Sequence, residues 1–322
     1  MTGFELILPF LRPIEHLILD PEISEIMVNG PEHVFVERAA SVQAVPDISL
    51  TPKSLEVAVR NIARRLGDDI SEEKPILDSR LPDGSRVAAV IPPCSLQGVT
   101  LTIRKFNAKH FQIEHLIRIG TITQDLADVL RQSVVGRQNI LISGGTGTGK
   151  TTLLNILAHF IPEYERILVI EDTAEIQITT PNLVRFEARR EQAGLPGVTI
   201  RDLLKASLRH RPDRILLGEI RGAEAFDLLQ LLNTGHSGTI STVHANSAQQ
   251  ALSRFTGCVL QSNVELPYRA IKSNIADSLN LLIHIERHPG RRRVSGVLKI
   301  ERYDLENDRY TFERIFAREE ES

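Results

Sequence analysis

The stretch ISGGTGTGKTTLLNIL, from Ile142 to Leu157, decides the fold that this sequence predicts. It fits the pattern G-x(4)-G-K-[ST] in full, with an apolar run, NILIS, before it and a helical pattern, TTLLNILAHF, after it. Glycines permit the positive φ angles that bring backbone N–H groups onto phosphate oxygens, and the N-terminus of a helix adds partial positive charge. The stretch therefore predicts a phosphate-binding loop. A glycine-rich loop without a ligand is the alternative.

The residues of this loop have distinct predicted tasks. Lys150 is expected to reach the β- and γ-phosphates of a nucleotide, and the hydroxyl of Thr151 is expected to bind Mg²⁺. The predicted ligands are ATP and Mg²⁺. The predicted nucleotide-binding residues are Gly144, Gly145, Thr146, Gly147, Thr148, Gly149, Lys150, Thr151 and Thr152.

Composition favours an ordinary globular chain of more than one domain. The 322 residues exceed what one compact core usually needs, and 42% are hydrophobic and 25% charged. A net charge of −3 gives no overall attraction to nucleic acid or anionic lipid. The two cysteines, Cys94 and Cys258, form no CxxC pair, so the sequence supports neither a zinc ribbon nor a disulfide scaffold. A reducing cytoplasm is the expected setting.

The N-terminal segment FELILPFLRPIEHLILD is apolar but interrupted by Pro9, Arg12, Pro13 and Glu15. It lacks a basic leader, and no apolar run approaches the roughly 18 residues of a membrane span. We therefore expect neither a signal peptide nor a membrane anchor. The segment is predicted to pack on its own domain, and attachment to a membrane surface is the alternative.

Patterns along the chain divide it into two predicted domains. An α+β domain over 1–106 has a hairpin at Asn29-Gly30-Pro31, a helix from Leu55 to Leu66, a turn and strand in LPDGSRVAAVIPP, and a strand in VTLTIRKF. A linker is expected over 107–121, with a helical part around Glu114, and an ATPase domain over 122–322 whose first helix Thr123 caps. There, the near-continuous apolar runs NILIS, RILVIED, DRILLGEI and GTISTVHA predict a parallel sheet covered on both faces.

Acidic residues follow two of these predicted strands. Glu171, Asp172 and Glu175 lie at the carboxyl end of one, where ligands bind in open α/β sheets and where a carboxylate can deprotonate water. The run RILLGEIRG resembles a Walker B strand that ends in Glu219, which is predicted to act on water or on the Mg²⁺ shell, while Arg221 pairs with an acid. The alternatives are a solvated acidic turn and a buried structural Glu–Arg pair.

Two histidines, His236 and His244, flank the last of the predicted strands. Each alone is more often a core or loop residue than a functional one, and their spacing is not that of zinc ligands. Beside a nucleotide site, they are candidates for sensing the γ-phosphate.

These four blocks, GGTGTGKT, IEDTAEIQ, LLGEIRG and TGHSGTISTVHA, resemble in order the Walker A, Asp box, Walker B and His box of the secretion ATPases of type II and type IV systems. The resemblance extends upstream to LPDGSRVAAVIPP and LTIRKF. It weakens before about Ile23 and after about Arg287. It implies a RecA-like P-loop NTPase core with a smaller α+β amino-terminal domain, an α/β fold overall.

The resemblance also implies a role for each matching residue. Glu175 matches the acid proposed to activate water, Glu219 the Walker B acid, and His236 and His244 the His-box positions. In the amino-terminal domain, the resemblance matches Arg86 and Arg104 to arginines that reach the γ-phosphate when the domains close. The alternative for each is a surface charge or a charge at a strand edge.

Within the family, the chain looks closest to the conjugal-transfer and tight-adherence pilus branches; it lacks the four-cysteine insertion typical of the type II branch. The resemblance implies an ATP-hydrolysing homohexamer, peripheral on the cytoplasmic face of the inner membrane, that works with secretion or pilus components and contacts no nucleic acid sequence-specifically. Such a motor powers type IV secretion, conjugal transfer or pilus assembly.

Two other functions stay open. A RecA-like nucleic-acid translocase needs a basic, aromatic channel. The chain has no Trp and four Tyr, and the clearest basic cluster, Arg291 to Arg293, follows Pro289-Gly290 and is expected in a solvated hairpin turn. A regulator that uses nucleotide only as a switch would not need two acids beside the phosphates.

Overall fold

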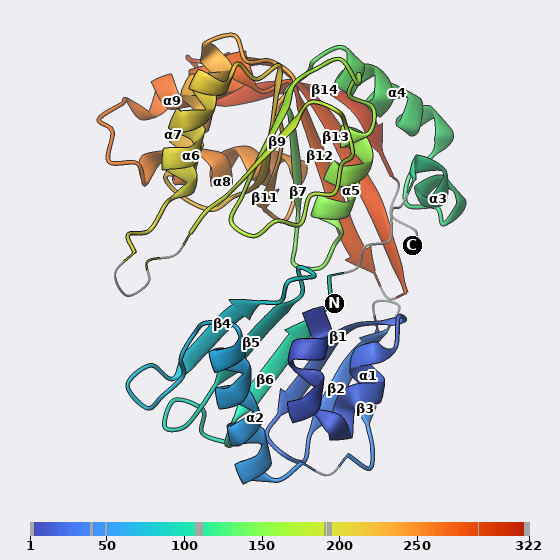
Figure 1. The fold of residues 1–322 in the computed structure, drawn as a ribbon. Coiled ribbons are helices and arrows are strands. Elements are labelled where there is room, and N and C mark those ends of the chain that lie inside the picture. The colour runs from blue at the N-terminus through green and yellow to red at the C-terminus, as the bar shows by residue number, and fades with distance from the viewer. Residues whose placement is uncertain are drawn as a thin grey trace. The chain divides into compact units, whose positions relative to one another are not determined.

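The computed structural model describes residues 3–38, 41–48, 50–106, 112–189, 191, 195–288 and 290–318. The chain forms two compact units, Met1–Lys109 and His110–Ser322 (Figure 1). The first five residues of the predicted linker lie outside the described residues. Its remainder contains α3 (Ile113–Arg118), whose Ile113 and Leu116 are buried in the core of the second unit.

The first unit is built on one antiparallel sheet of six strands in the order β3-β2-β1-β6-β5-β4. The predicted hairpin at Asn29-Gly30-Pro31 is confirmed, because it joins β1 to β2. Its elements are η1 (Gly3–Leu6), η2 (Leu8–Phe10), η3 (Arg12–Ile14), α1 (Glu15–Leu19), α2 (Pro52–Arg65), β1 (Ile23–Asn29), β2 (Val34–Arg38), β3 (Ser41–Val45), β4 (Ile76–Arg80), β5 (Arg86–Val90) and β6 (Thr100–Arg104).

The core of this unit explains the apolar N-terminal segment. Ile7, Leu11 and Ile14 are fully buried among the apolar residues of α2 and of the sheet. The segment thus packs on its own domain, as predicted. Helix α2 begins with a capping box, in which Thr51 and Ser54 each accept from the other's backbone N–H.

The second unit is built on an eight-stranded sheet in the order β14-β13-β12-β7-β11-β10-β8-β9. The six strands from β12 to β9 are parallel, as the apolar runs predicted, but β13 and β14 pair antiparallel, so the sheet is mixed. The other elements are α4 (Gln124–Val135), β7 (Ile140–Gly144), α5 (Lys150–Ala158), β8 (Ile167–Glu171), β9 (Leu183–Glu187), α6 (Ile200–Ser207), η4 (Leu208–His210), β10 (Arg214–Ile220), α7 (Glu224–Asn233), β11 (Ile240–His244), α8 (Ala248–Leu260), α9 (Tyr268–Ser278), β12 (Leu281–His288), β13 (Arg291–Asp304) and β14 (Arg309–Ala317).

Helices cover both faces of this sheet (Figure 1). Apolar residues of α3, α4 and α5 share one buried cluster with strand residues, and those of α6, α7, α8 and α9 share the other. Because β7, β8, β10 and β11 are parallel, their carboxyl ends meet at one edge of the sheet. That edge carries Gly144, Glu171, Glu219 and His244.

None of the helices in the described residues combines the length and the apolar character that crossing a membrane requires.

Candidate nucleotide-binding site

The glycine-rich loop connects β7 to α5, as predicted from its sequence. Gly147 and Gly149 have φ angles of +69° and +98°, which L side chains rarely adopt. A Cβ on Gly144 would lie 2.3 Å from the carbonyl oxygen of Ile285, so this position has no room for a side chain. Helix α5 begins at Lys150, and Thr151 and Thr152 lie in its first turn. The loop thus has the backbone form that a phosphate cradle needs.

Lys150 lies at the centre of the polar contacts of the loop. Its side chain is buried, and its Nζ donates to the carbonyl oxygens of Gly144 at 3.1 Å and of Gly145 at 2.8 Å. The same Nζ lies 3.3 Å from Nδ1 of His244. The loop therefore holds the ammonium group at the carboxyl end of β7, beside the end of β11.

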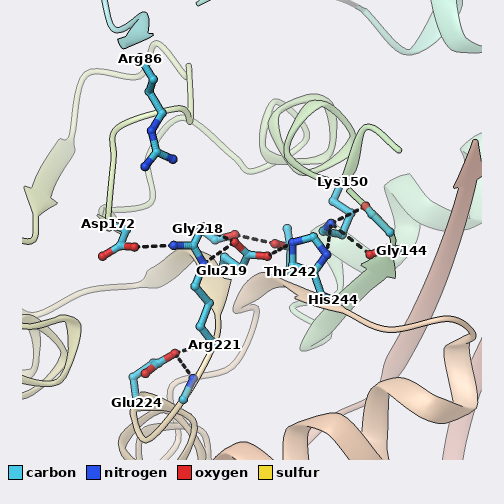
Figure 2. Close-up of polar contacts among 12 residues, drawn as sticks. Arg86, Gly144, Lys150, Asp172, Gly218, Glu219, Arg221, Glu224, Thr242 and His244 are labelled. Carbon is cyan, nitrogen blue, oxygen red and sulfur yellow. Dashed lines mark hydrogen bonds and ion pairs between the residues drawn. The ribbon is translucent and has the colours of Figure 1, made fainter. Parts of the chain in front are cut away.

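His244 connects Lys150 to Glu219 (Figure 2). Its Nε2 lies 2.7 Å from Oε1 of Glu219. An ammonium can only donate, so Nδ1 of His244 accepts and Nε2 is the protonated nitrogen of the neutral ring. Burial lowers the pKa of His244, and Lys150 lowers it further, while Glu219 opposes them. His244 is therefore a neutral imidazole between Lys150 and Glu219.

An irregularity in β10 places Glu219. The parallel pairing of β10 with β11 runs from Leu217 opposite Ser241 to Ile220 opposite Val243, so β10 has one extra residue at this point. Such a bulge turns a side chain away from its regular direction. The Thr242 hydroxyl donates to the Gly218 carbonyl at 2.8 Å and holds the bulged segment beside β11.

Arg221 joins the two acidic segments that the sequence singled out. Its Nη2 lies 2.6 Å from Glu219 and its Nη1 2.6 Å from Asp172 (Figure 2). The prediction that Arg221 pairs with an acid is confirmed. The pair is only partly buried, because the side chain of Arg221 is 54% exposed and that of Glu219 is 17% exposed. Glu224 accepts from the backbone N–H groups of Arg221 and Gly222 and fixes the turn that follows β10.

The three acids after β8 have different surroundings. Glu171 is 2% exposed and accepts from the backbone N–H groups of Glu175 and Ile176, both at 2.8 Å. Burial raises its pKa, and those two N–H groups act in the opposite direction. Asp172 and Glu175 lie in the loop beyond the strand. Glu171 therefore positions the loop that carries Glu175, a role that the sequence did not predict.

The side chain of Glu171 also explains why a glycine stands at position 218. A Cβ at this position would lie 3.1 Å from Cγ of Glu171, which is tighter than most contacts of a Cβ atom. The glycine before Glu219 thus leaves room for the buried acid of the neighbouring strand.

The two histidines of the last block differ in position. His244 is the final residue of β11, while His236 lies before the strand, with its Nδ1 3.4 Å from the Thr234 hydroxyl. This contact of His236 is local in the chain, whereas His244 contacts both Lys150 and Glu219. The structure therefore brings one of the two histidines into the cluster.

The two arginines of the first unit are direct neighbours. Arg86 begins β5, Arg104 ends β6, and the two residues lie opposite each other in the antiparallel pairing. Arg86 also lies 3.4 Å from Asp78 on β4. Sequence patterns placed both residues on strands, but their pairing depends on the register of the sheet.

The Arg291–Arg293 cluster lies at the expected hairpin, and the side chains of Arg291 and Arg292 are exposed. The turn forms as predicted between β12 and β13, with Pro289 outside the described residues. In addition, Nε of Arg292 donates to the Gly147 carbonyl of the glycine-rich loop at 3.0 Å. No local signal indicated this contact, because it requires β12 to lie beside β7 in the sheet.

The chain is similar to known proteins in both sequence and structure. Residues 10–298 match the family model described as Type II/IV secretion system protein. A probable conjugal transfer protein TrbB from Sinorhizobium fredii is 34% identical over 305 residues, which cover 92% of this chain and 90% of that protein. A type IV secretion system protein VirB11 from Bartonella henselae is 32% identical over 328 residues, with 91% and 92% covered.

A solved structure also resembles the chain over nearly its full length. The VirB11 ATPase from the Brucella suis type IV secretion system, crystallised in complex with sulphate, is 30% identical with a TM-score of 0.50. The similarity covers 92% of this chain and 95% of that one.

Proposed function

The chain belongs to the Type II/IV secretion system protein family, and from this premise we propose that it is a Mg²⁺-dependent ATP-hydrolysing motor for type IV secretion, conjugal transfer or pilus assembly. As an ATPase of this family it binds nucleotide. The proposal adds the metal, the roles of the site residues, a homohexameric assembly and a place on the cytoplasmic face of the inner membrane beside secretion or pilus components.

One observation carries the proposal. A single chain of contacts runs from Lys150 through His244 to Glu219. It joins the lysine that we assign to phosphate to the acid that we assign to the Mg²⁺ shell or its water, and a protein that only bound nucleotide would not need the second group. A neutral His244 between them can respond to the charge on either side, which suits a sensor of the γ-phosphate.

In hydrolysis, a water oxygen bonds to the γ-phosphorus, the bond from that phosphorus to the ADP oxygen breaks, and the water proton passes to a carboxylate. We assign Glu175 to the activation of the water and Lys150 to the stabilisation of the developing phosphate charge. The contacts of Glu171 with the N–H groups of Glu175 and Ile176 support the first assignment, because they fix the backbone that carries Glu175.

The donor groups present fit a magnesium ion. Mg²⁺ prefers oxygen ligands and usually takes only a few from the protein, the remainder being water and phosphate. Thr151 supplies a hydroxyl in the first turn of α5, and Glu219 supplies a carboxylate at the end of β10. When bound, the ion would neutralise phosphate charge; Thr151 would hold it directly and Glu219 directly or through water.

For the first unit we propose that Arg86 and Arg104 act on the γ-phosphate. Their direct pairing across β5 and β6 supports this role, because it brings two guanidinium groups, each a strong donor to phosphate oxygen, to one place on the sheet. ATP binding would then favour a closed subunit and hydrolysis would release it, so that chemistry is coupled to movement.

Steady-state ATP turnover of the purified protein tests the proposal, with Lys150→Ala as the matched variant and with and without single-stranded DNA. We expect turnover that Lys150→Ala abolishes and that DNA leaves unchanged. Unchanged turnover in Lys150→Ala would refute the site, and strong salt-sensitive stimulation by DNA would favour the translocase instead. Light scattering with an ATP analogue that found only monomer would refute the hexamer.

A further inference from the structure

The β12–β13 hairpin extends past the end of β7 to the glycine-rich loop. β12 pairs with β7 as far as His284 opposite Ser143, and the loop begins at the next residue of β7. In the antiparallel pairing with β13, Arg287 lies opposite Arg292 and Ile285 opposite Val294. Directly opposed residues share a face of the sheet and the side-chain direction alternates along each strand, so these four residues lie on one face.

That face is the one that meets the loop. Ile285 and Val294 are buried in the same cluster as the leucines of α5. Beyond them, Nε of Arg292 donates to the Gly147 carbonyl at 3.0 Å. A Cβ on Gly147 would lie 3.1 Å from Nη1 of Arg287.

A Cβ on Gly149 would likewise meet Cδ of Arg292 at 3.3 Å. Both arginines thus pack against the two glycines whose positive φ angles shape the loop. The absence of side chains at these glycines is what gives the arginines room.

Two guanidinium groups directly opposite each other repel, and each is a strong donor to phosphate oxygen. We propose that this hairpin is part of the nucleotide site: Arg292 positions the glycine-rich loop through the Gly147 carbonyl, and Arg287 binds a phosphate oxygen of the nucleotide. The inference rests on the proposed function, because it assigns further residues to the same site. Unlike Arg86 and Arg104, these arginines come from the unit that carries the loop.

The pair sets affinity for nucleotide rather than the rate of chemistry. In the sheet, β12 and β10 lie on opposite sides of β7, so the hairpin and Glu219 approach the loop from different directions. Losing either arginine should therefore weaken the binding of ADP and ATP to a similar extent, and turnover at saturating ATP should change little.

Titration of a fluorescent ADP derivative onto the full-length protein tests this directly, in parallel with ATP turnover. We expect Arg292→Gln and Arg287→Gln each to raise Kd for ADP and KM for ATP about tenfold, as for one charged hydrogen bond, with kcat within about twofold. Arg292→Lys keeps the charge and a donor and should recover part of the affinity. Arg291→Gln is the matched control: it removes the same charge one residue away, on the other face of β13, and should bind as the wild type does.

The possible failures are distinguishable. If the wild type does not bind ADP, or Lys150→Ala binds it equally well, the proposed function fails and this inference fails with it. If Lys150→Ala loses ADP while Arg292→Gln and Arg287→Gln bind it normally, only the hairpin assignment is overturned. An equal loss in Arg291→Gln would also overturn it, since general charge would then explain the effect. If circular dichroism shows that Arg292→Gln does not fold, Arg287→Gln decides the matter in the same assay.

Discussion

Nε2 of His244 lies 2.7 Å from Oε1 of Glu219, at the carboxyl ends of two neighbouring parallel strands. The contact depends on the bulge in β10, which turns Glu219 toward β11. It makes Glu219 part of a connected group with His244 and Lys150 rather than an isolated carboxylate. Removing either end of this contact should therefore affect chemistry more than folding.

Glu219→Gln keeps the size and most of the hydrogen-bonding capacity of the side chain but removes its charge. We expect ATP binding to persist and hydrolysis to fall by about 10² or more, the usual contribution of a catalytic acid or base. Nucleotide titration and single-turnover hydrolysis measure the two effects separately. A variant that unfolds would instead indicate that the Glu219–Arg221 pair serves structure; Glu313→Gln, in the surface pair with Lys299, is the control for charge loss.

Glu175 and Glu171 should respond differently to the same substitution. Glu175→Gln should abolish turnover with little change in thermal stability. Glu171→Gln should lower the free energy of unfolding by about 1–3 kcal/mol, because the buried carboxylate accepts two backbone N–H groups. Denaturant unfolding and ATP turnover of both variants provide the check. Equal stability of the two would contradict the positioning role of Glu171.

Arg86→Gln and Arg104→Gln should slow turnover by as much as about 10³, as expected when an arginine that stabilises phosphate charge is lost. ADP binding should change much less than kcat. Arg60→Gln is a suitable control in the same unit, since Arg60 pairs with Glu56 on α2. If the two test variants behave like this control, Arg86 and Arg104 serve only the sheet.

Gly238→Ala and Gly235→Ala separate backbone strain from a steric clash. Both glycines have φ near +90°, at +84° and +94°, so each substitution costs about 1–2 kcal/mol of conformational strain. At Gly238 a Cβ would also lie 2.0 Å from Nη1 of the fully buried Arg214, whereas none of the described atoms lies within 4 Å of a Cβ on Gly235.

Arg214 is paired with the buried Glu165, so displacing it would disturb an ion pair that has little access to solvent. We therefore expect Gly238→Ala to be the more destabilised of the two by several kcal/mol in denaturant unfolding. Equal destabilisation would show that the segment before β11 accommodates the added methyl group.

His284 should make stability depend on pH. It is 4% exposed beneath the loop, with Nδ1 2.9 Å from the Ser143 hydroxyl. Burial lowers its pKa below the ordinary 6.5; Lys150 acts in the same direction and Glu286 in the opposite one. Because the folded state then binds the proton less readily than the unfolded state, the contribution is present above pH 6.5 and is lost as the pH falls through the folded pKa.

The check compares thermal unfolding of the wild type and His284→Gln between about pH 7.5 and about pH 5.5. The loss of stability on acidification should be smaller in the variant. An identical pH dependence in both proteins would rule out His284 as its source.

Much of this protein was determined by local sequence. The glycines of the loop, the apolar runs and the cap residues Thr51 and Thr123 act through near neighbours, and the elements they predicted are present. The placement of Lys150, Glu219 and His244 at one edge of the sheet also followed, because the carboxyl ends of parallel strands converge. The order of the four motif blocks pointed to the family.

Only the tertiary structure determined which residues the site side chains contact. Four contacts join residues that are distant in sequence. They are the contact of Glu219, in the bulge of β10, with His244, the packing of Glu171 against Gly218, the pairing of Arg86 with Arg104, and the hydrogen bond from Arg292 to Gly147. Each depends on strand order or register, which is set by how whole strands pack and not by the residues beside the side chain. For this reason Arg292, which was expected only in a solvated turn, also contacts the glycine-rich loop.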